Sequence, residues 1–241
     1  VRTMRGGPSG GTVASLLATV EAMQADPSVG RTMADPFALT PGFDGPPQPG
    51  GDGAAAYDAW VASWTAPFVM APINTKNVHR TNFLRGHPWG RQFRYDERQM
   101  TGDGERGRRR AMRGAWGSAV QQRLLGWAPA RALLARFVLP KPGQGPDAAA
   151  RERGRYEVWF VGRGPQEAPL RVVVRGDRDP GYGSTSKIVA ETARCLLDEV
   201  TPEMAGGGVW TPGAAMGLAL SRRLQAHAGL SFSVEPAHGA G

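Results

Sequence analysis

The chain has little cysteine, little histidine and no long hydrophobic run. Its 241 residues include one cysteine, Cys195, so an internal disulfide framework is excluded. Cys195 has apolar neighbours in a helical pattern, which predicts a small buried residue in a reducing compartment. The four histidines and the cysteine lack the spacing of zinc ligands, so no metal site is expected.

No stretch approaches the ~18–20 apolar residues of a membrane span. The first residues lack the charged-then-apolar pattern of a signal peptide. These features predict a cytoplasmic protein.

Lysine is also scarce, because it occurs only at positions 76, 141 and 187, while the formal net charge is +8. The positive charge therefore comes from arginine. Together with abundant alanine, glycine and proline, this bias is more typical of high-GC coding than of nucleic-acid binding. It bears on solubility and non-specific attraction, and no specific nucleic-acid partner is expected.

The pattern of the whole chain, 41% hydrophobic, predicts one α+β domain over 1–241, a mixed β-sheet covered by helices. Residues 40–55 and 139–150 read as loops, and 60–84 as a mixed strand or loop segment. Expected strands, from alternation and β-branched runs, are 1–4, 93–100, 156–161, 170–174 and 230–234, with a hairpin between the third and fourth. Expected helices are 12–24, 185–199, 212–226 and two within 106–138, separated near Gly126 and Pro129.

The stretch 176–187 places charge, glycines and hydroxyls between the strand 170–174 and the helix 185–199. A Gly-rich turn before a helix offers free backbone N–H groups and the positive end of the helix dipole, which suit an anionic ligand. The alternative is an ordinary capped turn, with Ser184 or Thr185 as the N-cap.

Two side chains in this stretch are candidates for chemistry. Lys187 carries a positive charge near the positive end of a helix, which a bound anion, or a salt bridge to Asp177 or Asp179, would rationalise. Tyr182 lies between two glycines, either exposed to a ligand or packed as a plug of the turn. Asp177 and Asp179 lack a third ligand nearby, so turn formation and arginine pairing are favoured over a metal or a shared proton.

A second polar group, Asn74, Thr75, His79 and Arg80, directly follows an apolar run. It either borders a cleft or forms a loop whose side chains bond their own backbone. The sequence Gly7-Pro8-Ser9-Gly10-Gly11 matches Gly-x-Ser-x-Gly literally. The proline before the serine, and the lack of an acid and a histidine in order, argue against a hydrolase.

The basic region 106–136 admits three interpretations: a solvated helix face, an amphipathic surface for a membrane or an acyl chain, or a nucleic-acid patch. The first is preferred. The third lacks interleaved exposed aromatic residues and any known binding motif.

Six blocks in order carry a resemblance to a known family: 6–12, 35–39, 66–75, 93–97, 176–187 and 210–217. Over about residues 5–235 the chain resembles saccharopine dehydrogenase-like oxidoreductases, in particular their branch of trans-acting enoyl reductases. Such enzymes have a dinucleotide-binding Rossmann domain followed by a region like this chain. The resemblance thus implies the C-terminal substrate and assembly domain of a two-domain dehydrogenase, with 207–241 packing against the dinucleotide-binding domain.

The nucleotide fingerprint Gly-x-Gly-x-x-Gly is missing from the chain. Glycines at 6, 7, 10 and 11 have the wrong spacing, and Ser186 stands where Gly181 and Gly183 would need a third glycine. We therefore expect NADP or NAD in the full-length enzyme and no cofactor on this chain alone.

The activity implied by the resemblance is reduction of a carbon–carbon double bond in a thioester-bound acyl chain, in trans with a polyketide synthase. Implied partners are the dinucleotide-binding domain, an acyl thioester or acyl-carrier protein, a second copy in a homodimer, and a membrane surface. The alternative is a non-catalytic interaction module that binds a carrier or a membrane through its arginine-rich helices. The expected site has Lys187 and Tyr182 as catalytic residues, Gly7, Ser9, Gly10 and Thr12 towards the cofactor, and Asn74, Thr75, His79, Arg80, Asp177, Asp179 and Ser184 along the substrate cleft.

Overall fold

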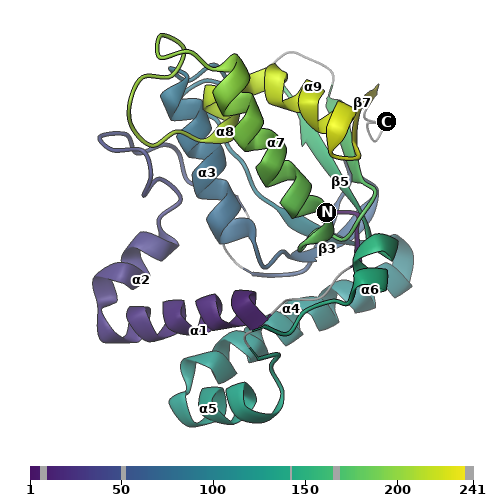
Figure 1. Cartoon of the computed structure of the whole chain (residues 1–241). Helices are drawn as coiled ribbons and strands as arrows, with labels where there is room; N and C mark the ends of the chain where they lie inside the picture. The colour runs from purple at the N-terminus through teal and green to yellow at the C-terminus, as the bar shows by residue number, and fades with distance from the viewer. Residues whose placement is uncertain (6–9, 50–52, 142, 165–168, 237–241) are drawn as a thin grey trace.

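The structure, a computed structural model, describes residues 1–5, 10–49, 53–141, 143–164 and 169–236. Within these ranges the chain forms nine helices and two β-sheets (Figure 1). The α+β class expected from the sequence is confirmed. The strands divide between two sheets instead of one, and each pairing of described strands is antiparallel.

The larger sheet has the strand order β1-β5-β6-β7. Its strands are β1 (Thr3–Arg5), β5 (Arg155–Gly162), β6 (Leu170–Gly176) and β7 (Leu230–Pro236). The predicted hairpin is confirmed, since β5 and β6 pair with Trp159 opposite Val173. Aromatic and β-branched residues dominate both strands, and such side chains pack well on a pleated surface.

Two helices cover one face of this sheet, α7 (Gly183–Glu199) and α9 (Gly217–His227). The hydrophobic core between these helices and the sheet includes Cys195, which is buried as predicted. This core packs against Val174 and Phe232 of the sheet. The helix expected over 212–226 is in fact two, because the chain breaks after α8 (Pro212–Ala215) at Gly217, whose φ is +52°.

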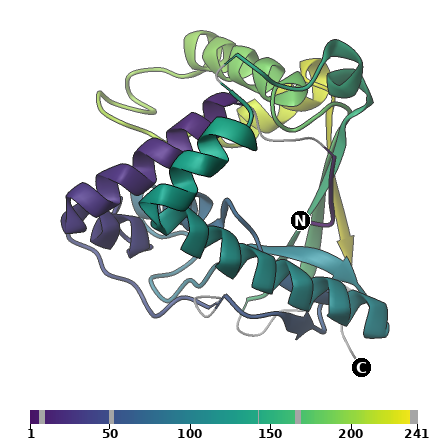
Figure 2. The ribbon, with the colours of Figure 1, turned by 90° about the horizontal axis from the view of Figure 1, so that it is seen from below.

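The smaller sheet has the order β2-β3-β4, with β2 (Ala56–Asp58), β3 (Ser63–Pro67) and β4 (Arg98–Gly102). The long helix α4 (Gly104–Gly126) packs beside it (Figure 2). Helix α5 (Ala128–Phe137) follows after a break at Trp127. Two helices separated near Gly126 were predicted, and this is confirmed.

Several expectations for local structure are wrong. Residues 71–84 form helix α3 (Ala71–Leu84) instead of strand or loop, with a proline in its first turn and no side-chain cap. In the segment expected as a strand over 93–100, only Arg98 onward pairs, as β4. The loop 139–150 contains the start of α6 (Ala148–Arg153), whose N-cap is Asp147.

The N-terminal helix α1 (Gly10–Ala25) agrees with the expected helix, and α2 (Pro27–Ala34) follows it without having been expected. The start signal of α2 is readable in the sequence. Asp26 accepts a hydrogen bond from the Ser28 amide, and proline stands at the first helical position.

Candidate functional site

The Gly-rich turn before α7 is organised by Asp179, which is 1% exposed. Its carboxylate accepts backbone N–H bonds from Gly181, Tyr182 and Gly183 at 2.9, 3.2 and 2.6 Å. The amides expected to bind an external anion therefore bind a carboxylate of the chain itself. The turn is capped, but by Asp179 and not by Ser184 or Thr185.

The two hydroxyls of this turn have other partners. The Ser184 hydroxyl lies 2.8 Å from the hydroxyl of Tyr156, and the Thr185 hydroxyl donates to the Pro180 carbonyl at 2.7 Å. Ser184 is buried, so it fixes the start of α7 against β5.

The two aspartates do not form a pair. Asp177 is exposed and its carboxylate lies against Gly229, whereas Asp179 is buried in the turn. Arginine pairing was expected for both carboxylates. In the described residues, the one bond from an arginine to either aspartate runs from Arg155 to the backbone carbonyl of Asp177, and not to a carboxylate. Turn formation, the other part of that expectation, is what the structure shows for Asp179.

Tyr182 and Lys187 are the accessible side chains at this end of α7. The ring of Tyr182 is 47% exposed, and Lys187 is half-buried one turn into the helix. Among the residues that the structure describes, no carboxylate pairs with Lys187, so the alternative of a local salt bridge to Asp177 or Asp179 is wrong. An ammonium group near a helix N-terminus without a partner is available to an anionic oxygen.

The second predicted group lies on α3, and two of its members make long-range hydrogen bonds. Asn74 donates to a carboxylate oxygen of Glu97 at 2.8 Å. Arg80 donates to the carbonyls of Leu39 and Val209, at 2.8 and 2.9 Å. Arg80 thereby ties two loops to α3. Thr75 is buried in the same helix.

Lys76 belongs to the same polar stretch of the sequence but was not among the predicted site residues, and it is buried. Its ammonium donates to the carbonyls of Met33 and Pro72, at 2.7 and 2.9 Å. Burial lowers the pKa of Lys76, and the charge of Asp35 acts against that shift. The side chain therefore joins α2 to α3 through its cation.

His79 is 3% exposed and packs among aromatic rings. Its ring centroid lies 4.5 Å from that of Phe37 and 5.7 Å from that of Phe93. Its Nε2 is buried and has no hydrogen-bond partner in the described part of the chain. Burial lowers the pKa of His79, so the folded chain holds this imidazole neutral at neutral pH.

The lowered pKa of His79 predicts a pH dependence of stability. Because the unfolded chain takes up this proton at higher pH, the contribution is fully present above about pH 6.5 and is lost as the pH falls below it. The variant His79→Phe keeps an aromatic ring and removes the titration. Its free energy of unfolding should therefore fall less between about pH 7.5 and 5.5 than that of the parent. Urea denaturation at both pH values measures this, and equal losses in the two proteins would contradict it.

Two of the four predicted cofactor-facing residues, Gly10 and Thr12, lie at the start of α1. Gly7 and Ser9 fall outside the described residues, as do the first three residues of the Gly-x-Ser-x-Gly match. Gly10 begins α1 and its amide donates to the Gln144 carbonyl at 2.9 Å, while Thr12 lies exposed in the first turn. The described strands all pair antiparallel, so they do not build the parallel βαβ unit that holds a dinucleotide. The described residues therefore contain no such unit.

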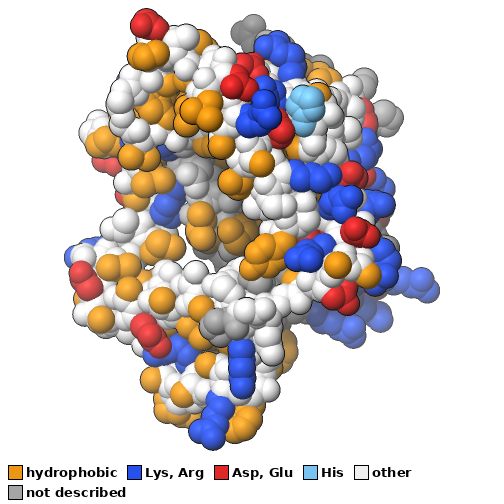
Figure 3. Space-filling model, in the orientation of Figure 1, with side chains coloured by type: hydrophobic (Ala, Val, Ile, Leu, Met, Phe, Trp, Pro, Cys, Tyr) orange, Lys and Arg blue, Asp and Glu red, His pale blue; other side chains and the backbone are white. Residues whose placement is uncertain are grey.

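The N-terminal ends of α3 and α7 point towards α1 (Figure 1). Figure 3 shows hydrophobic side chains gathered around a hollow at this place. At the start of α3, Val69, Met70 and Ile73 are exposed, as is Tyr182 before α7. The predicted cleft residues are thus distributed over two helix ends, and no described cleft contains them. No cluster of metal-ligating side chains occurs in the described ranges.

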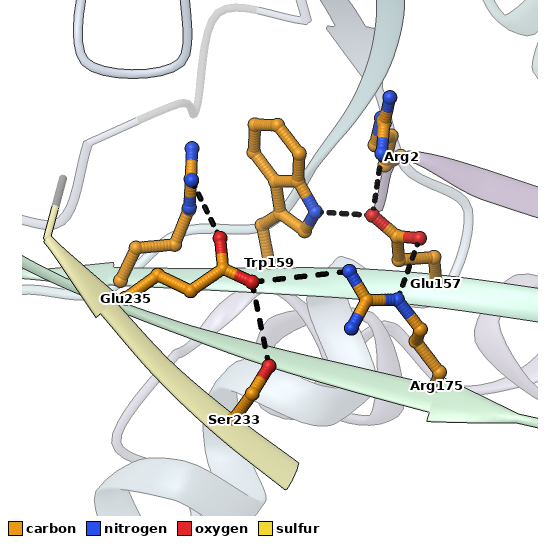
Figure 4. Close-up of polar contacts among 7 residues, drawn as sticks. Arg2, Glu157, Trp159, Arg175, Ser233 and Glu235 are labelled. Carbon is orange, nitrogen blue, oxygen red and sulfur yellow. Dashed lines mark hydrogen bonds and ion pairs between the residues drawn. The ribbon is translucent and has the colours of Figure 1, made fainter. Parts of the chain in front are cut away.

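The other face of the large sheet carries a charged network that the sequence did not reveal (Figure 4). The Glu157 carboxylate accepts hydrogen bonds from Arg2, Trp159 and Arg175 at 2.7, 2.6 and 3.0 Å. Burial alone would raise the pKa of this carboxyl, but these bonds and the charge of Arg2 lower it to about 2. Two strands away, on β7, Glu235 pairs with Arg171 of β6 at 2.6 Å.

Comparison with known proteins gives relatives by sequence. A protein of Mycobacterium tuberculosis that bears the provisional name of a trans-acting enoyl reductase is 36% identical over 96% of this chain. Proteins of Mycobacterium ulcerans and Mycobacterium bovis named trans-acting enoyl reductase are 32% and 31% identical over 90% of it. No family profile matches the chain, and no solved structure matches it. The chain is thus homologous to proteins named trans-acting enoyl reductases, and it spans only 57% and 54% of their lengths.

Proposed function

We propose that this chain is the substrate-side part of an enoyl reductase that acts on thioester-bound acyl chains, in trans with a polyketide synthase. The observation that carries the proposal is the 36% identity along 96% of the chain to a protein that bears the provisional name of a trans-acting enoyl reductase. The resemblance to saccharopine dehydrogenase-like oxidoreductases supplies the remainder: NADP or NAD is held by a part of the full-length enzyme outside these residues. A cytoplasmic location and a homodimer are further parts of the proposal.

The N-terminal end of α7 carries the kinds of side chain that this reaction needs from a protein. Saturating a double bond conjugated to a thioester places negative charge on the thioester oxygen, and a cation or hydroxyl donor stabilises that charge. Lys187 and Tyr182 are accessible here. Asp179 and Ser184 act as positioning residues, because they fix the turn that carries Tyr182 and begins α7.

The start of α3 supports the site in a different way. Its exposed apolar residues, Val69, Met70 and Ile73, offer surface for an acyl chain. Asn74 and Arg80 hold α3 in place through hydrogen bonds, and His79 does so through ring contacts, while Thr75 is buried in the same helix. Asp177 is exposed in the turn before α7, with its carboxylate against Gly229.

The test is a hybrid enzyme in which this chain replaces the corresponding segment of a full-length mycobacterial trans-acting enoyl reductase. The hybrid should reduce a trans-2-enoyl thioester with NADPH or NADH. Lys187→Ala should lower its turnover by about 10–100-fold, because a donor to the developing anion is removed. Arg194→Ala, at an exposed cation two turns further along α7, is the control and should have no effect.

Far-ultraviolet circular dichroism should show both variants folded. Turnover that Lys187→Ala leaves unchanged would remove Lys187 from the site. A folded hybrid that binds the cofactor but reduces no thioester would refute the proposed function.

The alternative, a non-catalytic interaction module, is favoured by one feature, the corner between α4 and α5. Trp127 at this corner is 63% exposed and follows Arg123, and Phe137 at the other end of α5 is 70% exposed and follows Arg136. Aromatic and basic side chains together suit a membrane surface or an acidic carrier protein. No described helix combines the length and apolarity needed to cross a bilayer. An inactive hybrid, together with sedimentation of the chain on anionic vesicles that Trp127→Ser abolishes, would favour this alternative.

A further inference from the structure

A cleft of about 560 Å³ separates the two sheets, on the side opposite the helices that cover the large sheet. Its volume lies within the range of small-molecule sites. None of the residues predicted for the reductase site lines it. The lining residues that matter here come from the segment before β1, from β5, the β2–β3 turn, β4 and α4: Arg2, Trp159, Val61, Ala62, Met100 and Arg110.

Two guanidinium groups line this cleft, and they differ in how they are held. Arg2 donates to Glu157 at 2.7 Å and lies 4.8 Å from the ring centroid of Trp159, so its position is fixed (Figure 4). Arg110 is exposed on α4 and makes no ion pair with the described residues. Arg2 is partly neutralised by Glu157, whereas Arg110 contributes an uncompensated positive charge.

The cleft also has an apolar side, formed by Val61, Ala62 and Met100. Ala62 has φ of +46°, in the left-handed region that residues other than glycine rarely adopt. Such a conformation costs on the order of 1 kcal/mol or more, and it persists only where the surrounding structure imposes it. Strained residues of this kind are concentrated at binding sites, which supports a ligand at this rim.

We infer that this cleft binds the phosphate end of a phosphopantetheine arm, the carrier to which an acyl thioester is attached. Guanidinium groups pair strongly with phosphate oxygens, and the cleft presents two. In this arm the phosphate is followed at once by a carbon bearing two methyl groups, which matches an apolar wall beside the cations. The inference rests on the proposed function, because it takes the substrate to be a carrier-bound thioester.

Calorimetric titration of the whole chain tests this inference with three probes: 4′-phosphopantetheine, pantetheine and inorganic phosphate. Phosphopantetheine should bind at least about 10-fold more tightly than either of the other two, because only it offers both phosphate and arm. Arg110→Ala should weaken its binding by about 10-fold, a typical effect of losing one charge-assisted pair. Arg113→Ala, three residues further along the same helix and also exposed, should bind as the parent does.

Three results would overturn the inference: no binding of phosphopantetheine, equal binding of pantetheine, or equal affinity in Arg110→Ala. Equal affinity for inorganic phosphate would overturn the assignment to the carrier arm. Coenzyme A, which carries additional phosphates, is a fourth probe that identifies the source of the arm. If coenzyme A binds more tightly than phosphopantetheine, the arm belongs to coenzyme A. If the two bind equally, the arm belongs to a carrier protein.

These outcomes separate this inference from the proposed function. In one case, the hybrid reduces an enoyl thioester, but Arg110→Ala binds phosphopantetheine as tightly as the parent. The proposed function then stands and the inference about the cleft is refuted. In the other case, phosphopantetheine binding depends on Arg110, but the hybrid reduces no thioester. The cleft then stands as a phosphopantetheine site and the proposed reductase function is refuted.

Discussion

Replacing Asp179 with alanine is expected to lower the free energy of unfolding by about 3–5 kcal/mol, because it removes a charged acceptor shared by three backbone N–H groups. The carboxylate accepts these three part-buried bonds, and Asp179 itself is 1% exposed. Against a typical total stability of about 5–15 kcal/mol, this is a large fraction. Urea denaturation with a two-state fit measures the change.

Two controls define the cause of that loss. Asp179→Asn keeps one acceptor oxygen and should lose less than half as much. Asp177→Ala removes an exposed carboxylate two residues away and should change stability by less than about 0.5 kcal/mol. If Asp179→Ala were no less stable than Asp177→Ala, Asp179 would not be the cap of the turn.

The second large effect is expected at Gly107, inside α4. An alanine here would normally favour a helix by about 1 kcal/mol over glycine. In this fold a Cβ atom at Gly107 would collide with the backbone carbonyl of Gly102, where α4 packs across the end of β4. Gly107→Ala should therefore destabilise the protein by about 2–3 kcal/mol, since backbone must move to admit the methyl group.

Gly117, ten residues later in the same helix, is the matched control. A Cβ atom there meets nothing within 4 Å. Gly117→Ala should raise stability by about 0.5–1 kcal/mol, through helix propensity alone. Opposite signs for the two variants would confirm how α4 sits on the small sheet. Stabilisation by both would contradict that packing.

Regular patterns in the sequence predicted the elements whose faces are simple. The hairpin of β5 and β6 has β-branched and aromatic residues on both strands, and α7 and α1 show helical spacing. Helix α3 was missed because buried polar residues, Thr75, Lys76, His79 and Asn82, occupy the face that would otherwise be apolar. Their partners come from other parts of the chain, so nothing in the local pattern reveals them.

The candidate site likewise has features that the sequence predicted and features that it did not. The sequence identified the turn before α7 as unusual, but its amides bind a carboxylate of the chain itself, which was neither of the two alternatives, an external anion or a cap by Ser184 or Thr185. That this carboxylate is Asp179 depends on the turn folding back on itself, which residue spacing does not determine. The cleft between the sheets escaped the sequence entirely, because Arg2, Arg110 and Trp159 are far apart in the chain and meet only through the packing of two sheets.

Titration of the isolated chain tests the central claim. This claim is that the chain forms the substrate-binding part of the enzyme and has no nucleotide pocket of its own. A trans-2-enoyl thioester of phosphopantetheine should bind with a Kd below about 1 mM, and NADPH and NADH should show no saturable binding in that range. Saturable binding of either nucleotide by this chain alone, with no binding of the thioester, would contradict the account.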